Sequence, residues 1–435
     1  MDFLLATLLI LIFAAAILLG APLFAIIAGG TALLFHLVAG QNLAVPIIEM
    51  WRLANAPGFV AIPLFIFAGY LFAESRASDR LIKVSDALIG WLPGGLTVVT
   101  VVVCTIFTAV TGASGITIIA VGGLLLPALT ANGHKNNFSL GLITASGSSG
   151  VLLLPSLPLL IYGMVASVDI AELFLAGFIP GLLIIFLLSA YGVFSGLKNR
   201  VPVTPFSINR LAKSLWEIKW VLPLPFVVVG GIYSGVITVG EAASVTAVYA
   251  LITECLIYRE VSLDKLINLS IQSMIMVSAI LIVLAAALGF TNFLVDVEVP
   301  QKLVTLTTAH ISSKVVFLLI LNGFLLVVGC LMDIFSAIII VVPLIAPVAA
   351  QFDIDPVHLG IIFLANLEIG YLTPPVGVNL FIASLRFETP IIRLYAVVLP
   401  FLLLLVLALM LITYMPDLSL WLVEISGKRV PVLQF

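Results

Sequence analysis

An apolar run that cannot form one continuous helix constrains this chain more than any other feature. The run extends from Leu140 to Ile161, LGLITASGSSGVLLLPSLPLLI, and contains Gly147, Gly150, Pro155 and Pro158. Glycine weakens a helix and proline removes a backbone donor, so a helix here must break in its middle. Inside a bilayer the freed backbone groups find no partner in lipid, and such a break is tolerated only where it lines a cavity.

The same pattern recurs once, about 219 residues later. The second run, Leu359 to Phe381, places Gly360 on Gly141 and Pro374 on Pro155. Each broken run also follows another interrupted apolar stretch, one around TGASGIT and the other around GCLMDIFS. Paired discontinuous helices in matching positions of two halves are typical of secondary transporters, whose site lies at the interface of the repeats.

Composition places the whole chain in a membrane. Of its 435 residues, 63% are hydrophobic and only 9% are charged, whereas soluble domains carry about 25% charged residues. The net charge of -3 and the scattered basic residues do not favour a nucleic-acid partner. The three cysteines lie far apart inside apolar runs, as expected of small buried hydrophobic residues. Residues 1–20 lack a basic n-region, so we interpret them as a first membrane span rather than a secretory signal.

Hydropathy predicts an all-α polytopic membrane protein built from two repeats. The expected elements of the first repeat, 1–197, are scaffold helices within 1–92 (3–19, 21–39, 57–74 and an amphipathic arm at 76–92), a hairpin at 97–131, a broken helix at 138–167 and a helix at 172–196. A polar linker follows at 198–219. The expected elements of the second repeat, 220–435, are helices at 220–237, 240–257 and 271–295, an arm at 296–312, a hairpin at 313–350, a broken helix at 356–386 and a last helix at 391–414.

The two interrupted stretches determine the topology that we expect. At about 34 residues each they are too long for one span and suit re-entrant helical hairpins. Each half then crosses the membrane five times, and an odd number inverts the second half. Along this path 13 of the 18 Lys and Arg residues fall on one side, which the positive-inside rule makes cytoplasmic, together with the linker. Both termini are then predicted to be periplasmic.

Several strings resemble those of a known family. They are TGASGITIIAVGGLLLPAL, SGSSGVLLLPSLPLLIYG, GEAASVTAVYALI, GCLMDIFSAIIIVVPLIAPVA and DPVHLGIIFLANLEIGYLTPPVGVNLFIAS, in family order along nearly the whole chain. They resemble the large membrane subunit, the M or DctM-type subunit, of the tripartite ATP-independent periplasmic (TRAP) transporters. The chain departs from the family at Pro155-Ser156, where relatives often have two prolines.

The resemblance implies a fold and a function. The fold is that of an ion-transporter superfamily, with an elevator-like transport domain that holds both hairpins and both broken helices. The function is sodium-coupled uptake of a small organic acid across the bacterial inner membrane, without enzymatic activity. The implied partners are a periplasmic substrate-binding protein and a small four-helix membrane subunit. Because the sequence begins directly with the large subunit, we expect that small subunit to be a separate chain.

Sodium is a hard cation that favours several oxygen ligands, and unwound backbone carbonyls supply them without buried charge. We therefore expect one ion between the first hairpin tip and the first break, and a second at the corresponding place in the second half. The residues of the first site are Gly112, Ala113, Ser114, Ser146, Gly147, Ser149 and Gly150. Those of the second are Gly329, Met332, Asp333, Asn366, Gly370 and Thr373. An alternative role for each serine is close helix packing.

A carboxylate substrate needs hydrogen-bond donors, and the amides at helix N-termini after each break can supply them. The candidate substrate-binding residues are Ser114, Thr117, Ser148, Ser156, Asp333, Ser336, Val376 and Asn379. Arg386 and Arg52 could bind the acid directly, but a position at the membrane interface is the alternative for both.

Acidic residues within membrane segments are costly and usually functional. For Asp333 the alternatives are support of a cation site and a cap of the hairpin helix. Glu368 either serves an ion site or a gate, or pairs with a nearby cation. For Glu241, which follows a helix start, we favour a structural role at the positive end of the helix dipole.

Three other functions are weaker alternatives. A self-sufficient sodium- or proton-coupled dicarboxylate carrier would share the repeats and hairpins but need no binding protein. An intramembrane aspartyl protease would need a second buried acid beside Asp333, and no GxGD-like pair occurs in the sequence. A passive channel would not accumulate its substrate against a gradient.

Overall fold

The computed structural model describes residues 21–426, except 38, 39, 41, 43, 53–58 and 204, and in addition residues 13, 15 and 19. The expected first helix at 3–19 therefore lies almost entirely outside the described residues. Within them the chain is helical and contains no strand, which confirms the all-α prediction.

The helices follow the chain in a regular succession. Up to the polar linker they are α2 (Leu23–Leu37), α3 (Ala44–Arg52), α4 (Ala61–Glu74), α5 (Ala77–Ile89), α6 (Gly95–Thr111), α7 (Ser114–Ala131), α8 (Asn136–Ser146), α9 (Leu157–Ala166) and α10 (Ile170–Asn199). From there they are α11 (Ile208–Ile218), α12 (Pro223–Tyr233), α13 (Val239–Leu251), the π-helix η2 (Ile252–Ile257), α14 (Leu263–Asp296), α15 (Val299–His310), α16 (Lys314–Leu331), α17 (Ile334–Ala350), α18 (Pro356–Gly370), α19 (Val378–Arg386), α20 (Ile391–Tyr414) and α21 (Asp417–Ile425).

Three of these helices do not appear among the elements expected from the sequence. They are α3, α21 and α11, the last of which lies inside the polar stretch 198–219. In α11 the hydroxyl of Ser207 accepts a hydrogen bond from the Arg210 amide and caps the helix. Helix α14 begins at Leu263, well before the expected 271, so it is the longest helix of the described chain.

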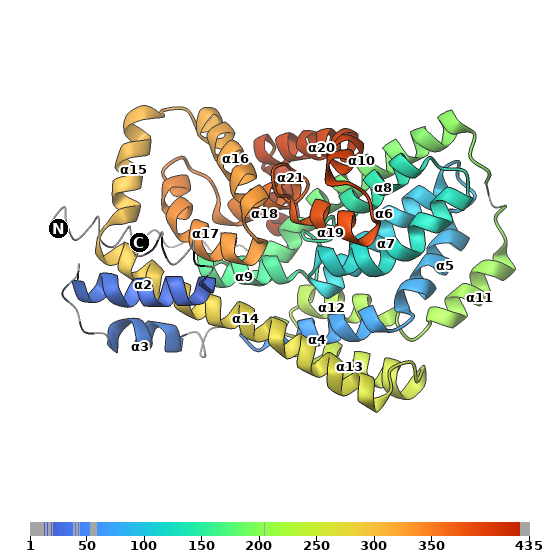
Figure 1. The fold of residues 1–435 in the computed structure, drawn as a ribbon, viewed down its shortest axis with the longest axis horizontal. Coiled ribbons are helices and arrows are strands. Elements are labelled where there is room, and N and C mark those ends of the chain that lie inside the picture. The colour runs from blue at the N-terminus through green and yellow to red at the C-terminus, as the bar shows by residue number, and fades with distance from the viewer. Residues whose placement is uncertain are drawn as a thin grey trace.

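The helices form two groups (Figure 1). One group runs along the lower side of the view, where α4 packs against α13 and α14, and α2 and α3 pack against α14. The other group lies above it and consists of α6–α10 and α16–α21. The long helix α14 also contacts α17, so it joins the two groups.

Within the upper group the packing is reciprocal. Helices α6–α10 and α16–α20 follow one another in the same order about 219 residues apart. Helix α7 packs on α19, and its counterpart α17 packs on α9; likewise α8 packs on α20, and α18 packs on α10. Each half of this group is therefore completed by helices of the other half.

Two glycines lie at close contacts between helices of the two halves. A Cβ atom at Gly141 of α8 would lie 2.4 Å from the Val397 carbonyl oxygen and 2.6 Å from the Phe401 ring, both on α20. A Cβ atom at Gly360 of α18 would lie 2.6 Å from the Tyr162 ring. The two positions that align in the sequence thus both require a residue without a side chain.

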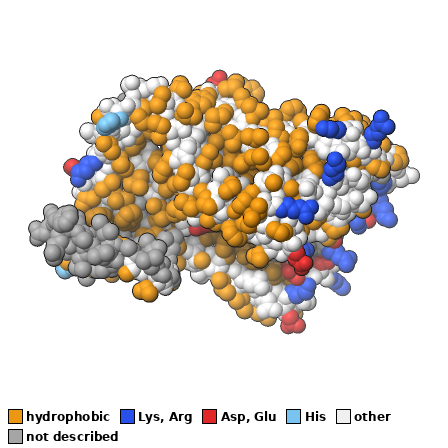
Figure 2. All heavy atoms as spheres, turned by 45° about the horizontal axis from the view of Figure 1, so that its top comes forward, with side chains coloured by type: hydrophobic (Ala, Val, Ile, Leu, Met, Phe, Trp, Pro, Cys, Tyr) orange, Lys and Arg blue, Asp and Glu red, His pale blue; other side chains and the backbone are white. Residues whose placement is uncertain are grey.

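The outer surface suits a lipid environment. Six helices of the described residues are long and apolar enough to cross a membrane, and α11 with α12, bent by 67°, would make a seventh span. Figure 2 shows hydrophobic side chains over most of the visible face, with Lys and Arg gathered at the end where α5 and α11 lie. The prediction of a multi-pass membrane protein is confirmed.

We predict that Gly141→Ala destabilises the protein by roughly 1–3 kcal/mol, because the added methyl group forces α8 away from α20. Circular dichroism melting of the detergent-purified protein measures the change. The matched control is Gly323→Ala in α16, where a Cβ would meet nothing within 4 Å. Helix propensity should make that variant slightly more stable. Equal melting temperatures for the two variants would show that the α8–α20 crossing is not close.

Candidate functional site

A cavity of about 450 Å³ lies between four segments: the α6–α7 turn, the α16–α17 turn, the break between α8 and α9, and the break between α18 and α19. Its lining residues come from the α6–α7 turn, the α8–α9 break, the start of α17, the α18–α19 break and α14. They are Gly112, Ala113, Ser114, Gly115, Val151, Pro158, Met276, Ala279, Ile280, Val283, Asp333, Ile334, Phe335, Ser336, Ile339, Tyr371, Val378 and Ile382. The structure therefore brings the four segments singled out in the sequence together around one space.

The first break packs against the end of α6, where it forms a hydrogen bond with Thr108. The Thr108 hydroxyl donates to the Gly147 carbonyl oxygen at 2.6 Å and lies 2.6 Å from the Thr117 hydroxyl on α7. Its single proton goes to the carbonyl, so Thr117 donates to Thr108. A Cβ at Gly150 would lie 2.2 Å from the Thr105 carbonyl oxygen, so glycine is needed for this contact. Thr108 thus joins α6, α7 and the break.

The second break packs against the end of α16 in a similar way. A Cβ at Gly370 would lie 2.6 Å from the Cα of Gly329, so the two backbones touch. The Gly377 amide donates to the Cys330 carbonyl at 3.3 Å, and the Tyr371 hydroxyl accepts from the Ile334 amide at 2.6 Å. Tyr371 therefore connects this break to the start of α17.

Hydrogen bonds within the breaks satisfy much of the remaining backbone. In the first, Val151 and Leu153 amides donate to carbonyls three residues earlier, and Ser156 caps α9 by accepting from the Leu159 amide. In the second, Thr373 donates from its amide in the same three-residue pattern, and the Tyr395 hydroxyl donates to the Pro375 carbonyl at 2.7 Å. Each break also contains one cis peptide, Leu154–Pro155 or Pro374–Pro375.

The starts of four helices face this region, and they differ in how their amides are used. Asp333 caps α17 by accepting from the Phe335 and Ser336 amides, each at 3.0 Å, so those two amides are engaged. The starts of α7 and α19 have no side-chain cap, and Ser114, Gly115 and Val378 line the cavity there. Amides at an uncapped helix start bind anions well, which applies to α7. At the start of α19 the Asn379 amide already donates to the Tyr371 carbonyl oxygen at 3.2 Å.

One hydrogen bond joins these two uncapped starts. The buried Ser114 hydroxyl donates to Asn379 Oδ1 at 2.7 Å. The Asn379 Nδ2 atom is buried and makes no hydrogen bond within the described residues. A donor is therefore available next to the α7 and α19 amides.

Several oxygens near the breaks are also buried without hydrogen-bond partners within the described residues. They are Ser146 Oγ, Ser148 Oγ, Asn366 Oδ1 and both carboxyl oxygens of Glu368. Glu368 forms no ion pair there and has the Ser149 hydroxyl as its polar neighbour, so the expected alternative of a nearby cation is not seen. Unpartnered buried oxygens are what a hard cation such as Na⁺ would bind.

The remaining acidic and basic candidates have structural contacts. Glu241 forms a capping box with Thr238 at the start of α13, in agreement with the structural role that we favoured. Asp333 caps α17 and at the same time lines the cavity. Arg386 does not line the cavity, because its Nε atom donates to the Ile119 carbonyl oxygen. The Arg52 side chain lies outside the described part of the structure.

Other predicted residues lie behind the cavity wall rather than on it. Asn366 donates to Asn322 Oδ1 at 2.7 Å, and the Thr373 hydroxyl donates to the Ile369 carbonyl. Thr117, Ser148, Ser149 and Ser156 are buried among the helices, and Met332 and Val376 are partly exposed next to the turn and the break. Of the predicted residues, Gly112, Ala113, Ser114, Asp333 and Ser336 are those that line the cavity.

Sequence reasoning missed three contributors. Thr108 and Tyr371 hold the breaks in place, and their neighbourhood in the sequence offered no signal beyond a hydroxyl near a glycine. The face of α14 formed by Met276, Ala279, Ile280 and Val283 closes the cavity from the lower helix group. Its positions i, i+3, i+4 and i+7 mark one side of a helix, but they are indistinguishable in sequence from a lipid-facing stripe.

Comparison with known proteins places this geometry in a family. Residues 10–418 match the model of the "Tripartite ATP-independent periplasmic transporter, DctM component". The chain belongs to this family. It is therefore a transporter permease component and not an enzyme, as the sequence had predicted.

Relatives within the family support the same assignment. The chain is 34% identical over 413 residues to an isethionate TRAP transporter permease protein, DctMQ, of Oleidesulfovibrio alaskensis. This match covers 94% of the chain but only 65% of the length of that relative. It is 32% identical to the C4-dicarboxylate large permease DctM of Pseudomonas aeruginosa (90% of this chain, 91% of the relative). It is also 32% identical to the ectoine/5-hydroxyectoine large permease UehC of Ruegeria pomeroyi (95% and 97%).

One solved structure shares the fold. The YdaH transporter of Alcanivorax borkumensis, described as having an unusual topology, superposes with a TM-score of 0.61 over 87% of each chain, at 15% sequence identity. At this identity the likeness concerns the fold alone.

We predict that Ala279→Phe abolishes or strongly reduces uptake, because the ring would fill the cavity from the α14 side. Uptake of a transported acid into proteoliposomes measures the effect. The matched control is Ser278→Phe, which adds the same ring at an exposed position that does not line the cavity. Normal uptake by Ala279→Phe at normal protein level would mean that the substrate does not pass this cavity.

Proposed function

We propose that the protein carries out sodium-coupled secondary active uptake of a small organic acid that a periplasmic substrate-binding protein delivers. A small four-helix membrane subunit completes the transporter in the bacterial inner membrane. The single observation that carries this proposal is the cavity at which the uncapped starts of α7 and α19 meet.

The chemistry of the cavity favours a carboxylate or another small oxyanion. The start of α7 has no side-chain cap on its amides, whereas at the start of α19 the Gly377 and Asn379 amides donate to the Cys330 and Tyr371 carbonyl oxygens. The buried Asn379 Nδ2 atom, which makes no hydrogen bond within the described residues, adds a side-chain donor beside them. The cavity lining contains no Lys, Arg or His among the described residues. Such a site binds the acid group by dipoles, and it releases the acid more easily than a site with a fixed positive charge would.

Sodium supplies the coupling in this proposal. The two ions are held between the α6–α7 turn and the first break, and between the α16–α17 turn and the second break. The support is the set of unpartnered oxygens at Ser146, Ser148, Asn366 and Glu368, together with the Asp333 carboxylate at the cavity. A bound cation would also offset the negative charge of Asp333 when an anionic substrate enters.

We propose an elevator-type movement of two inverted repeats as the mechanism. The α6–α10 and α16–α20 group moves as one body, and the α2–α4 and α12–α14 group is the scaffold. Reciprocal packing of α7 on α19 and of α17 on α9 supports a single moving body. With the basic end of the molecule in the cytoplasm, the proposal places both termini in the periplasm.

The decisive experiment is reconstitution in liposomes with an imposed sodium gradient and a panel of labelled acids, including a C4-dicarboxylate and isethionate. We expect accumulation that requires inward sodium and the two partner proteins. Omitting the binding protein tests the alternative of a self-sufficient carrier, and equilibration without accumulation would indicate a channel.

We predict that Asp333→Ala and Ser114→Ala raise the sodium concentration needed for half-maximal uptake more than they lower the protein level. Asp333→Asn keeps part of the helix cap without the charge, so it separates the cap from the cation site. Sodium titrations that are unchanged in all three variants would contradict the placement of the ions.

A further inference from the structure

A second cavity, of about 730 Å³, lies at the end of the molecule where α5 and α11 meet. Its walls are α5, the second half of α7, the end of α11 and the segment that follows η2. The lining residues are Arg76, Asp79, Arg80, Ile82, Lys83, Leu124, Leu125, Ala128, Trp216, Glu217, Lys219, Trp220, Ile257, Tyr258 and Glu260. This cavity is separate from the one between the breaks and has no role in the function proposed above.

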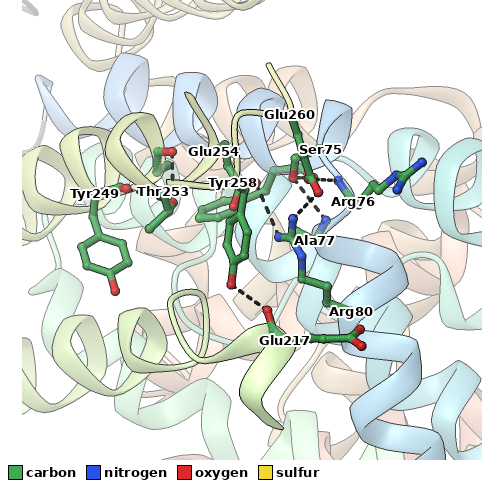
Figure 3. A network of polar contacts seen from close by, with 12 residues as sticks. Ser75, Arg76, Ala77, Arg80, Glu217, Tyr249, Thr253, Glu254, Tyr258 and Glu260 are labelled. Atoms are coloured by element: carbon green, nitrogen blue, oxygen red, sulfur yellow. Dashed lines mark hydrogen bonds and ion pairs between the residues drawn. The ribbon is translucent and has the colours of Figure 1, made fainter. Parts of the chain in front are cut away.

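Ion pairs hold its walls together (Figure 3). Arg80 Nη2 lies 2.5 Å from Glu260 Oε1, Arg80 Nη1 lies 3.6 Å from the fully buried Glu254, and the guanidinium lies 3.5 Å from the centre of the Tyr258 ring. The Tyr258 hydroxyl donates to the Glu217 carbonyl oxygen at 2.7 Å. Lys83 Nζ lies 2.8 Å from Glu217 Oε2. The carboxylates of Glu217, Glu254 and Glu260 thus already have cationic partners.

Three charged groups of the lining remain without a partner of opposite charge in the described structure. They are the Arg76 guanidinium, the Lys219 ammonium and the Asp79 carboxylate. The Lys219 Nζ atom lies over aromatic rings, 3.4 Å from the centre of Trp216 and 5.6 Å from that of Trp220. Arg76 and Asp79 lie one turn apart at the start of α5, and Lys219 lies at the end of α11. A ligand here meets two cations and one anion that have no partner of opposite charge within the described residues.

The surroundings of the cavity are those of a membrane interface. Trp216 is 70% exposed and Trp220 42% exposed, and both belong to the segment where α11 bends into the apolar α12. Tryptophan gathers at the level of lipid headgroups. Leu124, Leu125 and Ala128 give the cavity an apolar wall from α7. This combination suits a molecule with a charged head and apolar chains.

We propose that this cavity binds the headgroup of a phospholipid that carries both a phosphate and a primary ammonium, as phosphatidylethanolamine does. Arg76 and Lys219 bind the phosphate from opposite walls, and Asp79 accepts hydrogen bonds from the ammonium. The acyl chains lie along α7 and the exposed tryptophans. Because α5 leads directly into α6, the bound lipid connects the N-terminal end of the α6–α7 pair to α11.

Native mass spectrometry of the detergent-purified protein tests the proposal with defined dioleoyl lipids added in equal amounts. We expect tighter retention of phosphatidylethanolamine than of phosphatidylglycerol, which lacks the ammonium, or phosphatidylcholine, whose choline cannot donate. Equal retention of all three lipids by the unmodified protein would overturn the proposal before any variant is made. Ten-fold excess inorganic phosphate should not displace the lipid, since the chains contribute to binding; displacement would favour a free-anion site instead.

Two sets of variants assign the roles. Arg76→Gln and Lys219→Gln should each weaken phosphatidylethanolamine binding about fivefold, the effect expected for one basic residue at a lipid surface. Asp79→Asn should remove the preference over phosphatidylglycerol while phosphatidylglycerol binding stays the same or increases. The control Lys302→Gln changes an exposed lysine on α15, outside the cavity, and should leave lipid binding unchanged.

An unchanged lipid preference in Asp79→Asn would contradict the assignment of the ammonium. Loss of binding in Lys302→Gln as great as in Lys219→Gln would show that general surface charge, and not this cavity, retains the lipid. Circular dichroism of every variant confirms that it is folded before lipid binding is compared.

Discussion

Backbone polar groups at two interrupted helices must find partners inside the protein, and the rest of the upper helix group follows from that requirement. Lipid cannot supply hydrogen bonds, so α6 and α16 supply them through Thr108 and Cys330, and Ser156, Tyr371 and Tyr395 bond to further backbone groups around the breaks. Glycine at positions 150 and 370 lets the supporting helices come close enough. Some buried oxygens near the breaks still have no hydrogen-bond partner within the described residues, and these are available to ions.

The sequence alone predicted the all-helical class, the membrane location, the family and the segments that line the central cavity. Glycine and proline interrupt a long apolar helix whatever surrounds them, so the two breaks could be recognised without coordinates. The helix that ends at Tyr414 was expected at 391–414, because hydropathy and the flanking prolines mark it clearly. Gly141 and Gly360 were recognised as an aligned pair, and both lie at close helix crossings.

Other parts could not be predicted, for physical reasons. Nothing in a uniformly apolar helix such as α14 distinguishes a side that faces a cavity from a side that faces lipid. Whether the amides at a helix start are used depends on the local contacts. Only coordinates showed that Asp333 caps α17, that α7 has no side-chain cap, and that the Asn379 amide of α19 donates to the Tyr371 carbonyl oxygen. Predicted ligands such as Asn366 and Thr373 lie on the correct segment but do not line the cavity. Asn366 donates to Asn322 on α16, and the Thr373 hydroxyl donates to the Ile369 carbonyl oxygen of α18.

The exchange of helices between the two halves also affects how the chain is made. Helix α9 packs on α17, and α8 packs on α20, yet α17 and α20 are synthesised long after α8 and α9 have entered the membrane. During that interval the first interrupted helix has no covering from the second half. Its exposed amides and carbonyls must then find partners in α6 and α10, in water or in the insertion machinery. The N-terminal half therefore reaches its final packing only when the C-terminal half has been completed.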